Sequence, residues 1–217
     1  MSVFVAEELS EVLNTKVVIG RINMGLLNRI IIDDVLLDDQ SGQEMLKVTR
    51  LSAKFDIMPF FKGKISISSV QLFGFNINLR KETPDSPPNF KFVLDAFASK
   101  DTVKKENSLD LRINSILIRR GRMSYHVLSE EETPGKFNAK HIQLQNIIAN
   151  ISLKALSKDS LNLGIKRLSL DEKASGFSLK KMRLKLVANN KQTNIDNFTI
   201  ELPETSLKLD TIHLEYD

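Results

Sequence analysis

Hydrophobic positions along this chain come in alternating couples, and each couple is separated from the next by two polar residues. In the clearest copy, Ile30 and Ile32 precede Asp33-Asp34, and Val35 and Leu37 follow. Alternation with a period of two is typical of a strand with one buried face. The polar pair breaks the phase, so the strand either bulges and keeps both couples on one concave side or passes from one sheet face to the other. We favour the bulge, because bulges repeated in neighbouring strands curl a sheet into a trough.

The same frame recurs along the whole chain, whereas roughly one or two copies are expected by chance. Because its central pair accepts both charge signs, the frame demands polarity and not a carboxylate. Asp33-Asp34 is therefore predicted to be structural, and Asp38 to Gly42 to form a turn. The polar pairs are Gly20-Arg21, Asp33-Asp34, Thr49-Arg50, Ser68-Ser69, Asn114-Ser115, Gln145-Asn146, Lys166-Arg167, Lys180-Lys181, Asp196-Asn197 and Asp210-Thr211. Gly74 and Gly121 each follow a frame and suit a second bend.

Two short helices are predicted beside the strands. Residues 3–14 place Val5, Leu9, Val12 and Leu13 on one face, and this helix either plugs the end of a core or lies on a membrane surface. The proline-rich stretch 81–90 predicts a loop, followed by a helix with its apolar side formed by Phe90, Val93, Leu94 and Phe97. Together, residues 81–108 form a loop-helix insertion. Since the frame continues on both sides of every interruption, residues 1–217 are predicted to be one elongated unit.

These patterns predict a mainly β fold: an elongated, curved antiparallel sheet that forms an open groove, with a short N-terminal helix and one short inserted helix. With 217 residues, 41% of them hydrophobic and 27% charged, the chain is expected to fold around a real core. The net charge of +4 is a mild bias that is compatible with anionic lipid headgroups. No stretch approaches the ~20 apolar residues that cross a bilayer. We expect the chain to be a piece of a longer protein, with any export or anchoring segment removed.

Residues that carry chemistry are scarce. His126, His141 and His213 are far apart in the sequence, lie on predicted strands and lack zinc-ligand spacing. Cysteine is absent, and no nucleophile, phosphate-binding or dinucleotide motif occurs. The sequence therefore predicts no catalytic, metal-binding or cofactor-binding residue, and no enzyme. Lys180, Lys181, Arg183 and Lys185 crowd one strand. They form either a solvated outer face or a contact for phosphate groups; nucleic acid is disfavoured, because aromatic residues are only 6% and tryptophan is absent.

The chain has more apolar strand positions than two short helices can cover. Either the sheet folds over itself, or its concave face stays open to an apolar occupant, for which acyl chains are the natural candidate. Ten strands side by side span roughly 43 Å. The predicted lipid-groove lining is Ile65, Ile67, Val70, Leu72, Leu111, Ile113, Ile116, Ile118, Ile142, Leu144 and Ile147. The alternative is a scaffold or chaperone-like module that pairs with outer-membrane strands by β-augmentation.

Two long segments resemble a known family. Residues 17–81, and the later stretches "FKFVLDAFASKD" and "LDLRINSILIRRGRMSYHV", are similar to the N-terminal region of the TamB/AsmA-like family, in particular its Bacteroidetes-type members. The resemblance is specific over most of residues 5–127, and its best markers are Gly63 to Ile67 and Ile32 to Val35. Beyond residue 127 it rests on the repeat alone.

The resemblance implies a periplasmic protein with an inner-membrane signal anchor ahead of the first helix, and an apolar β-taco groove. It also implies a role in outer-membrane biogenesis: phospholipid movement between the two membranes, and assembly of some outer-membrane proteins with a barrel partner. This chain departs from the family pattern, because it lacks both the anchor and the C-terminal region that contacts the barrel. We therefore expect that this segment alone makes no contact with the barrel partner.

Overall fold

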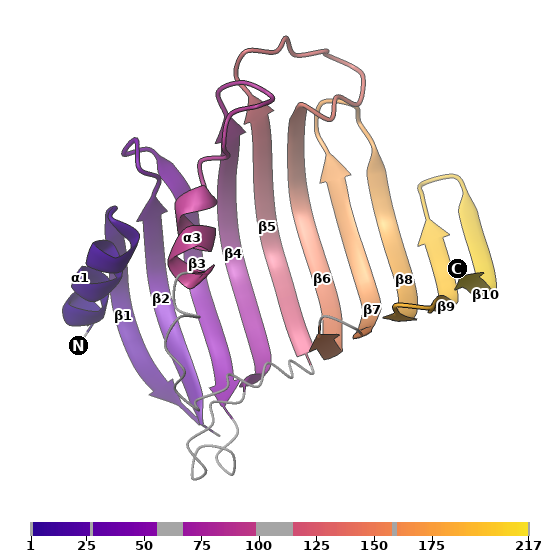
Figure 1. Ribbon diagram of the computed structural model, residues 1–217, viewed down its shortest axis with the longest axis horizontal. Helices are drawn as coiled ribbons and strands as arrows, with labels where there is room; N and C mark the ends of the chain where they lie inside the picture. The colour runs from indigo at the N-terminus through magenta and orange to yellow at the C-terminus, as the bar shows by residue number, and fades with distance from the viewer. Residues whose placement is uncertain (1, 27, 56–66, 99–114, 158–159, 217) are drawn as a thin grey trace.

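The strands of this chain form a single open sheet. The computed structural model describes residues 2–26, 28–55, 67–98, 115–157 and 160–216. Ten strands lie side by side in chain order and do not close into a barrel, with a helix at one end and a second, short helix beside the sheet (Figure 1). The predicted fold class is confirmed. The elements are α1 (Ser2–Leu13), β1 (Val17–Gly25), β2 (Arg29–Asp38), β3 (Glu44–Phe55), β4 (Ile67–Lys81), α3 (Lys91–Ala98), β5 (Ser115–Val127), β6 (His141–Ser157), β7 (Ser160–Glu172), β8 (Ser178–Asn189), β9 (Gln192–Glu201) and β10 (Ser206–Glu215).

One strand pairing departs from the predicted antiparallel sheet. Neighbouring strands are antiparallel everywhere except at β4 and β5, which run parallel from Ser69 beside Ser115 to Lys81 beside Val127. A parallel pair needs a connection of a dozen residues or more to return the chain to its starting end. The segment between β4 and β5, which includes α3, supplies that length. Because of this insertion, β5 runs in the same direction as β4, and the sheet continues across the pair.

The phase breaks coincide with residues in the left-handed backbone region. These are Asp34 (φ 57°), Gly74 (φ 63°), Arg120 (φ 56°), Asn146 (φ 54°) and Asn197 (φ 55°). A left-handed residue within a strand turns two consecutive side chains to the same side, as in bulges that begin with such a residue. Asn and Asp tolerate this conformation better than other residues with a side chain. In β2, β6 and β9 the left-handed residue belongs to the predicted polar pair, so in these strands the pair marks the phase break.

Both apolar couples of a frame face the same side of the sheet. Ile19 and Ile22, on either side of Gly20-Arg21, pack in one cluster. Val48 and Leu51 likewise belong to one cluster across their polar pair, as do Leu144 and Ile147. The prediction of a shared face is confirmed for these strands. The alternative, that each strand crosses from one face to the other, is wrong for them.

The way the bend is built differs along the sheet. From β1 to β4 the register on the two sides of the break is the same, because Gly20, Asp34, Thr49 and Gly74 lie opposite one another. All four strands break their alternation at the same level. No strand has an extra residue there, so the predicted bulge, in which two residues of one strand oppose one residue of the next, is absent at this level. Register shifts do accompany the breaks between β5 and β9.

Two predicted frames are displaced. In β4 the left-handed residue is Gly74, and in β5 it is Arg120, so the predicted pairs at Ser68-Ser69 and Asn114-Ser115 do not mark these bends. Ser68 is instead an extra residue near the start of β4, where the register with β3 shifts. Asn114 lies outside the described residues. The expected second bend at Gly74 is confirmed, and the one at Gly121 is shifted by one residue to Arg120.

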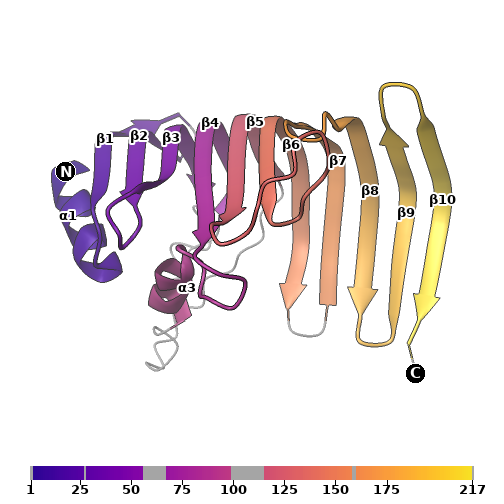
Figure 2. The same cartoon turned by 90° about the horizontal axis from the view of Figure 1, so that it is seen from above.

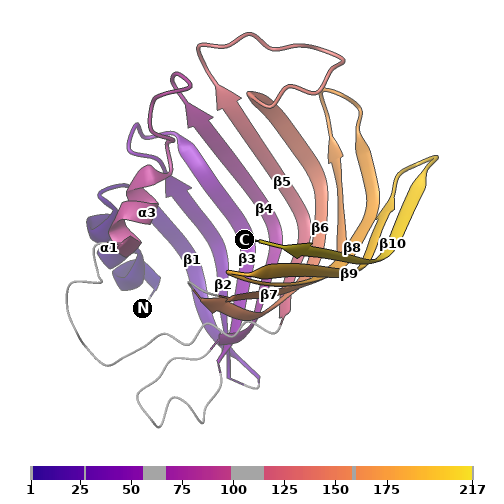
Figure 3. The same ribbon diagram turned by 45° about the vertical axis from the view of Figure 1, so that its right-hand side comes forward.

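The helices pack on the apolar face at the N-terminal end of the sheet. Ala6 of α1 is buried against Val17 and Ile19, and Phe92 and Val93 of α3 pack on the same cluster. Figures 1, 2 and 3 show both helices on the side toward which the sheet curls. The helix thus plugs the end of a core, as one of the two predictions proposed.

The predicted apolar sides of both helices are only partly correct. In α1, Val5 and Leu13 pack inward, but Leu9 and Val12 are 40% and 52% exposed. In α3, Leu94 is 57% exposed, and the side chain of Phe97 lies outside the described part of the chain. A smaller arc of each helix is therefore buried than its sequence pattern indicates.

In the described part of the chain, the side chains at the centre of the sheet are buried by other strand residues. Val48, Phe75 and Ile147 are 4%, 7% and 8% exposed, and all the hydrophobic residues packed against them come from strands. Curvature brings side chains of neighbouring strands together on the concave side. Gly121 shows how close they come: a Cβ atom there would lie 2.4 Å from the Phe75 ring and 3.0 Å from Ile147 Cβ.

We expect Gly121→Ala to lower the free energy of unfolding by about 1–3 kcal/mol, because the added methyl group overpacks the concave face. Chemical denaturation measures this loss. In the double variant Phe75→Leu/Gly121→Ala, the second substitution should cost clearly less than in the wild type, because the ring that the methyl group strikes is gone. Strict additivity of the two substitutions would contradict this packing.

At Asn197, which is exposed and left-handed, we expect Asn197→Gly to leave stability unchanged or slightly higher. Asn197→Val should cost about 1–2 kcal/mol, because a β-branched side chain is strained at positive φ. Thermal unfolding of both variants tests this. Asp210→Val, at an exposed position of β10 with an ordinary φ, is the control and should have little effect. Equal losses from Asn197→Val and Asp210→Val would show that the bend does not depend on this conformation.

Candidate functional site

The candidate site is the apolar face, defined as the side of the sheet that carries the apolar frame residues. Of the predicted lining, Val70 and Leu72 lie beside Ile116 and Ile118 across the parallel pair. The three predicted residues on β6, Ile142, Leu144 and Ile147, lie on the next strand, beside Tyr125, Met123 and Gly121 of β5. Leu72, Ile118 and Leu144 pack around the buried Val48, Phe75 and Ile147. Ile65, Leu111 and Ile113, and the side chain of Ile67, lie outside the described residues.

Sequence reasoning missed two residues at the centre of this face. Phe75 is buried there and Met123 packs against it, although neither belongs to a predicted frame. Both follow the displaced breaks, Phe75 after Gly74 and Met123 after Arg120. Gly74 was the available signal, since a glycine inside a strand pattern marks a phase break more strongly than a pair of serines.

The apolar face continues beyond the buried centre as a row of half-exposed aliphatic side chains. Directly paired positions carry Leu163 on β7, Leu186 on β8, Ile195 on β9 and Ile212 on β10. Each of these side chains keeps intermediate exposure. In the described part of the chain, no helix packs over β6 to β10. The row can therefore make nonpolar contact with another molecule, and its aliphatic side chains offer no group for acid–base chemistry.

The first aspartate pair has a structural role in the described structure. Asp33 is 5% exposed and accepts hydrogen bonds from Arg50, with 2.6 Å between Nε and Oδ1 and 3.3 Å between Nη2 and Oδ2. The hydrogen bond from Arg50 lowers the pKa of Asp33 below its ordinary value, against the opposing effect of burial. Its neighbour Asp34 is the left-handed residue of β2. Asp33 therefore pairs with Arg50 on the polar face, which is the side of the sheet opposite the apolar face, and Asp34 forms the bend.

The second pair forms the predicted turn. Asp39 is 2% exposed and accepts hydrogen bonds from Ser41, the Gln43 backbone and Asn89, while Arg80 lies 2.6 Å from its second oxygen. Burial alone would raise the pKa of Asp39, but these hydrogen bonds lower it below its ordinary value. Asp39 thus fastens the β2–β3 turn to the end of β4 and to the proline-rich loop.

Glu172 makes the same kind of contact at the end of β7. This carboxylate is 3% exposed and accepts hydrogen bonds from the backbone of Gln143, Ala174 and Ser175, and from the Ser175 hydroxyl. Burial acts to raise its pKa, yet the hydrogen bonds outweigh it and lower the pKa from 4.5 to about 2. Glu172 therefore ties the start of β6 to the turn after β7 and holds no proton available for catalysis near neutral pH.

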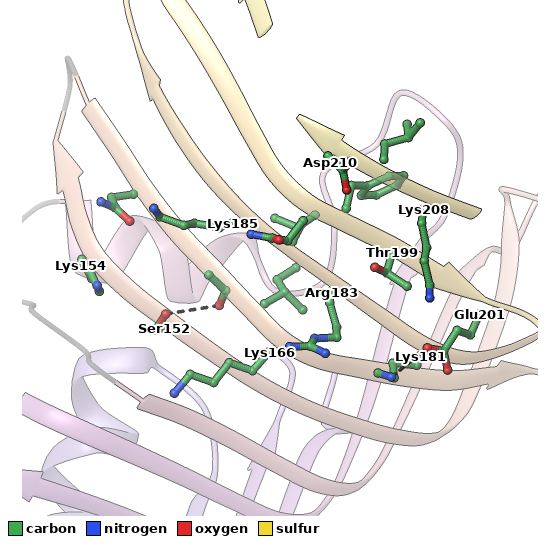
Figure 4. A pocket seen from close by; sticks show the side chains of 17 residues that line it. Ser152, Lys154, Lys166, Lys181, Arg183, Lys185, Thr199, Glu201, Lys208 and Asp210 are labelled. Carbon is green, nitrogen blue, oxygen red and sulfur yellow. Dashed lines mark hydrogen bonds and ion pairs between the residues drawn. The ribbon is translucent and has the colours of Figure 1, made fainter. Parts of the chain in front are cut away.

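The basic residues of β8 line a hollow on the polar face. The hollow has a volume of 770 Å³ and is walled by β6 to β10 (Figure 4). Its cations are Lys154, Lys166, Lys181, Arg183, Lys185 and Lys208, against Glu201 and Asp210. Lys181 pairs with Glu201 at 2.8 Å, and Lys185 lies 4.0 Å from Asp196. Lys181, Arg183 and Lys185 thus line one surface, and Lys180 is not part of this lining.

Two of the three histidines meet, which the sequence did not predict. His126 and His141 are register partners on β5 and β6, and their Nδ1 atoms lie 3.0 Å apart. His213 is exposed on β10 beside Asn194 and Glu215. The expectation that all three are isolated is therefore wrong for His126 and His141. The signal was the hairpin itself, because two strands joined by one connection pair residues at equal distances from its centre.

We expect the stability of the protein to fall as the pH is lowered from 4.5 towards 2. The folded state holds Glu172 as a carboxylate, so its contribution is complete above the ordinary pKa of 4.5 and is lost as the pH falls through the folded-state value of about 2. At neutral pH, Glu172→Gln should destabilise the fold by about 1–3 kcal/mol. The difference in unfolding free energy between wild type and variant, measured by denaturation at several pH values, should shrink on acidification. Exposed Glu204→Gln is the control; a pH-independent difference for Glu172→Gln would contradict the assignment.

The helices of the described chain are too short to span a bilayer: α1 has 12 residues and α3 has 8. Comparison with known proteins gives no match, either to a family model or to a curated protein.

Proposed function

We propose that this chain is a non-enzymatic segment of an envelope-biogenesis protein that binds and conducts phospholipid acyl chains along its apolar face. The observation that carries the proposal is the row of half-exposed aliphatic side chains over β7 to β10, which no helix covers in the described structure. Transfer of such a surface out of water is favourable. Acyl chains suit it, because they are extended, nonpolar and carry no hydrogen-bonding groups that would need partners.

Conduction, and not only binding, is supported by the repeat. Successive strands present similar aliphatic residues at matching positions, from Leu163 to Leu186, Ile195 and Ile212. Nonpolar contacts have no fixed direction, so an acyl chain that moves from one strand to the next exchanges one set of contacts for an equivalent set. The phospholipid headgroup then stays in water at the open side of the groove. Backbone hydrogen bonds are satisfied within the sheet and place no polar group in the path.

The cellular setting follows from the resemblance to the TamB/AsmA-like family. We propose that the full-length protein is anchored in the inner membrane and that this segment lies in the periplasm. Phospholipid moving between the inner and outer membranes would be its cargo. We propose that any contact with an outer-membrane barrel assembly protein uses other parts of the full-length protein.

A second candidate function rests on the edge strand β10. All its residues except Ile212 are exposed, and among the described residues its outer edge has no partner strand. An exposed edge can accept a further strand by β-augmentation. In that case the chain would be a structural or chaperone-like module for outer-membrane protein assembly. Substitution of the apolar face would then leave its activity unchanged.

We expect purified protein to carry co-extracted lipid, detected by organic extraction and mass spectrometry, and to take up a fluorescent phospholipid from vesicles. Leu186→Asp, which places a charge in the apolar row, should abolish most of this uptake. The matched control is Val187→Asp, at the next residue of β8 on the opposite face, beside Asn162 and Asn194. It should retain uptake.

The stability of Leu186→Asp separates an open groove from a filled interior. In an open groove the carboxylate reaches water, and the loss should stay below the several kcal/mol that burial of an unpaired charge costs. A loss of that size, or a protein purified without lipid, would contradict the proposal. Equal uptake by Leu186→Asp and Val187→Asp would favour the second candidate.

A further inference from the structure

Three side chains converge at the end of the β5–β6 hairpin. His126 lies at the end of β5, His141 at the start of β6, and Glu132 in the connection between them. The imidazole Nδ1 atoms are 3.0 Å apart, and one oxygen of Glu132 lies 3.7 Å from the first and 4.0 Å from the second. Hairpin pairing places the two histidines side by side, and the connection folds back to bring the carboxylate over them.

The spacing of these three atoms matches a metal site. A point in the plane of the triangle they form lies about 2.1 Å from each atom, within the range of about 2.0–2.2 Å for bonds from zinc to imidazole nitrogen and carboxylate oxygen. The two distances to Glu132 are too long for hydrogen bonds. A hydrogen bond between the two rings therefore accounts for their contact but leaves the position of the carboxylate unexplained. A cation at the central point would bond all three.

The surroundings of His141 already hold its ring as a ligand. Its Nε2 atom lies 2.9 Å from the backbone carbonyl oxygen of Glu130, which can only accept, so Nε2 carries the hydrogen. In the neutral ring Nδ1 then has a free lone pair, and this is the atom that points to His126 and Glu132. Most metal-bound histidines donate their other ring N–H to an acceptor such as this carbonyl, and that hydrogen bond fixes the tautomer.

Solvent can reach the cluster. A pocket of 250 Å³ is lined by Glu132, His141, Gln143 and Lys173, together with residues of the connection. His141 is buried, with 8% of its side chain exposed, while Glu132 is 62% exposed. Two histidines and one glutamate, with water in the remaining position, form a recognised zinc ligand set.

We propose that His126, Glu132 and His141 bind one zinc ion, which fastens the β5–β6 connection to the end of the sheet. The inference is independent of the proposed lipid function, because the cluster lies at the hairpin end and contains none of the residues of the apolar row. Imidazole and carboxylate also accept other first-row divalent metals, so zinc is the probe and not a claim of exclusive selectivity.

In the test, zinc chloride is titrated into chelator-treated protein in a calorimeter, and the melting temperature of the protein is measured with and without zinc. We expect one ion per chain and a higher melting temperature. His126→Ala and Glu132→Gln should each weaken zinc binding at least about tenfold, since loss of a residue that only hydrogen-bonds to a metal ligand already lowers metal affinity about 10–100-fold. Cobalt(II) in place of zinc should give visible absorption from the bound ion, and His126→Ala should remove it.

Both variants are expected to fold. Other contacts hold the connection, among them hydrogen bonds from Val127 to Lys140 and from Leu128 to Lys81, and the Lys140–Glu130 ion pair at 2.7 Å. His213→Ala, which removes the exposed histidine on β10, is the matched control and should bind zinc as the wild type does. Absence of binding to the wild type would overturn the proposal. So would unchanged affinity in His126→Ala and Glu132→Gln, or loss of binding in His213→Ala.

Discussion

The structure depends on one constraint of backbone geometry: a strand can curve and still keep its apolar residues on one side only if it breaks its alternation at the bend. Asp34, Gly74, Arg120, Asn146 and Asn197 provide that break by adopting a left-handed conformation. Neighbouring strands must break at the same level, or their hydrogen-bonded register is lost. From β1 to β4 they do so without a shift in register at that level, and the four strands curl together.

Curvature in turn replaces a second layer. Among the described residues, those that pack against the buried Val48, Phe75 and Ile147 come from the strands, since the concave side brings those side chains together. At the N-terminal end, α1 and α3 add a cover over Val17, Ile19 and Leu37. Toward β10, the described residues provide neither such close packing nor a covering helix, and the aliphatic row stays half exposed. Among the described residues, solvent exposure along the apolar face thus increases from the α1 end of the sheet toward β10.

Buried carboxylates at the ends of the strands hold the connections in place. Asp39 and Glu172 each accept several hydrogen bonds from a turn and from a neighbouring strand, and both have lowered pKa values. Their oxygens are fully used in these contacts, so they support the sheet and leave its faces free. The cluster of His126, Glu132 and His141 occupies the equivalent place at the β5–β6 connection, but among the described residues no donor lies within hydrogen-bond distance of the carboxylate, and a cation would fill that role.

The sequence by itself determined the fold class, the two helices and the shared face of the apolar couples in β1, β3 and β6, because alternation and its breaks are local properties of the chain. It also showed that Asp33-Asp34 is structural, since the same frame accepts other polar pairs. Only the tertiary structure decided the parallel β4–β5 pairing, the inward side of α1, the places of Phe75 and Met123, and the meeting of His126 with Glu132 and His141. These depend on which strand lies beside which and at what register, and that relation is set by contacts between segments far apart in the chain, which a local pattern does not contain.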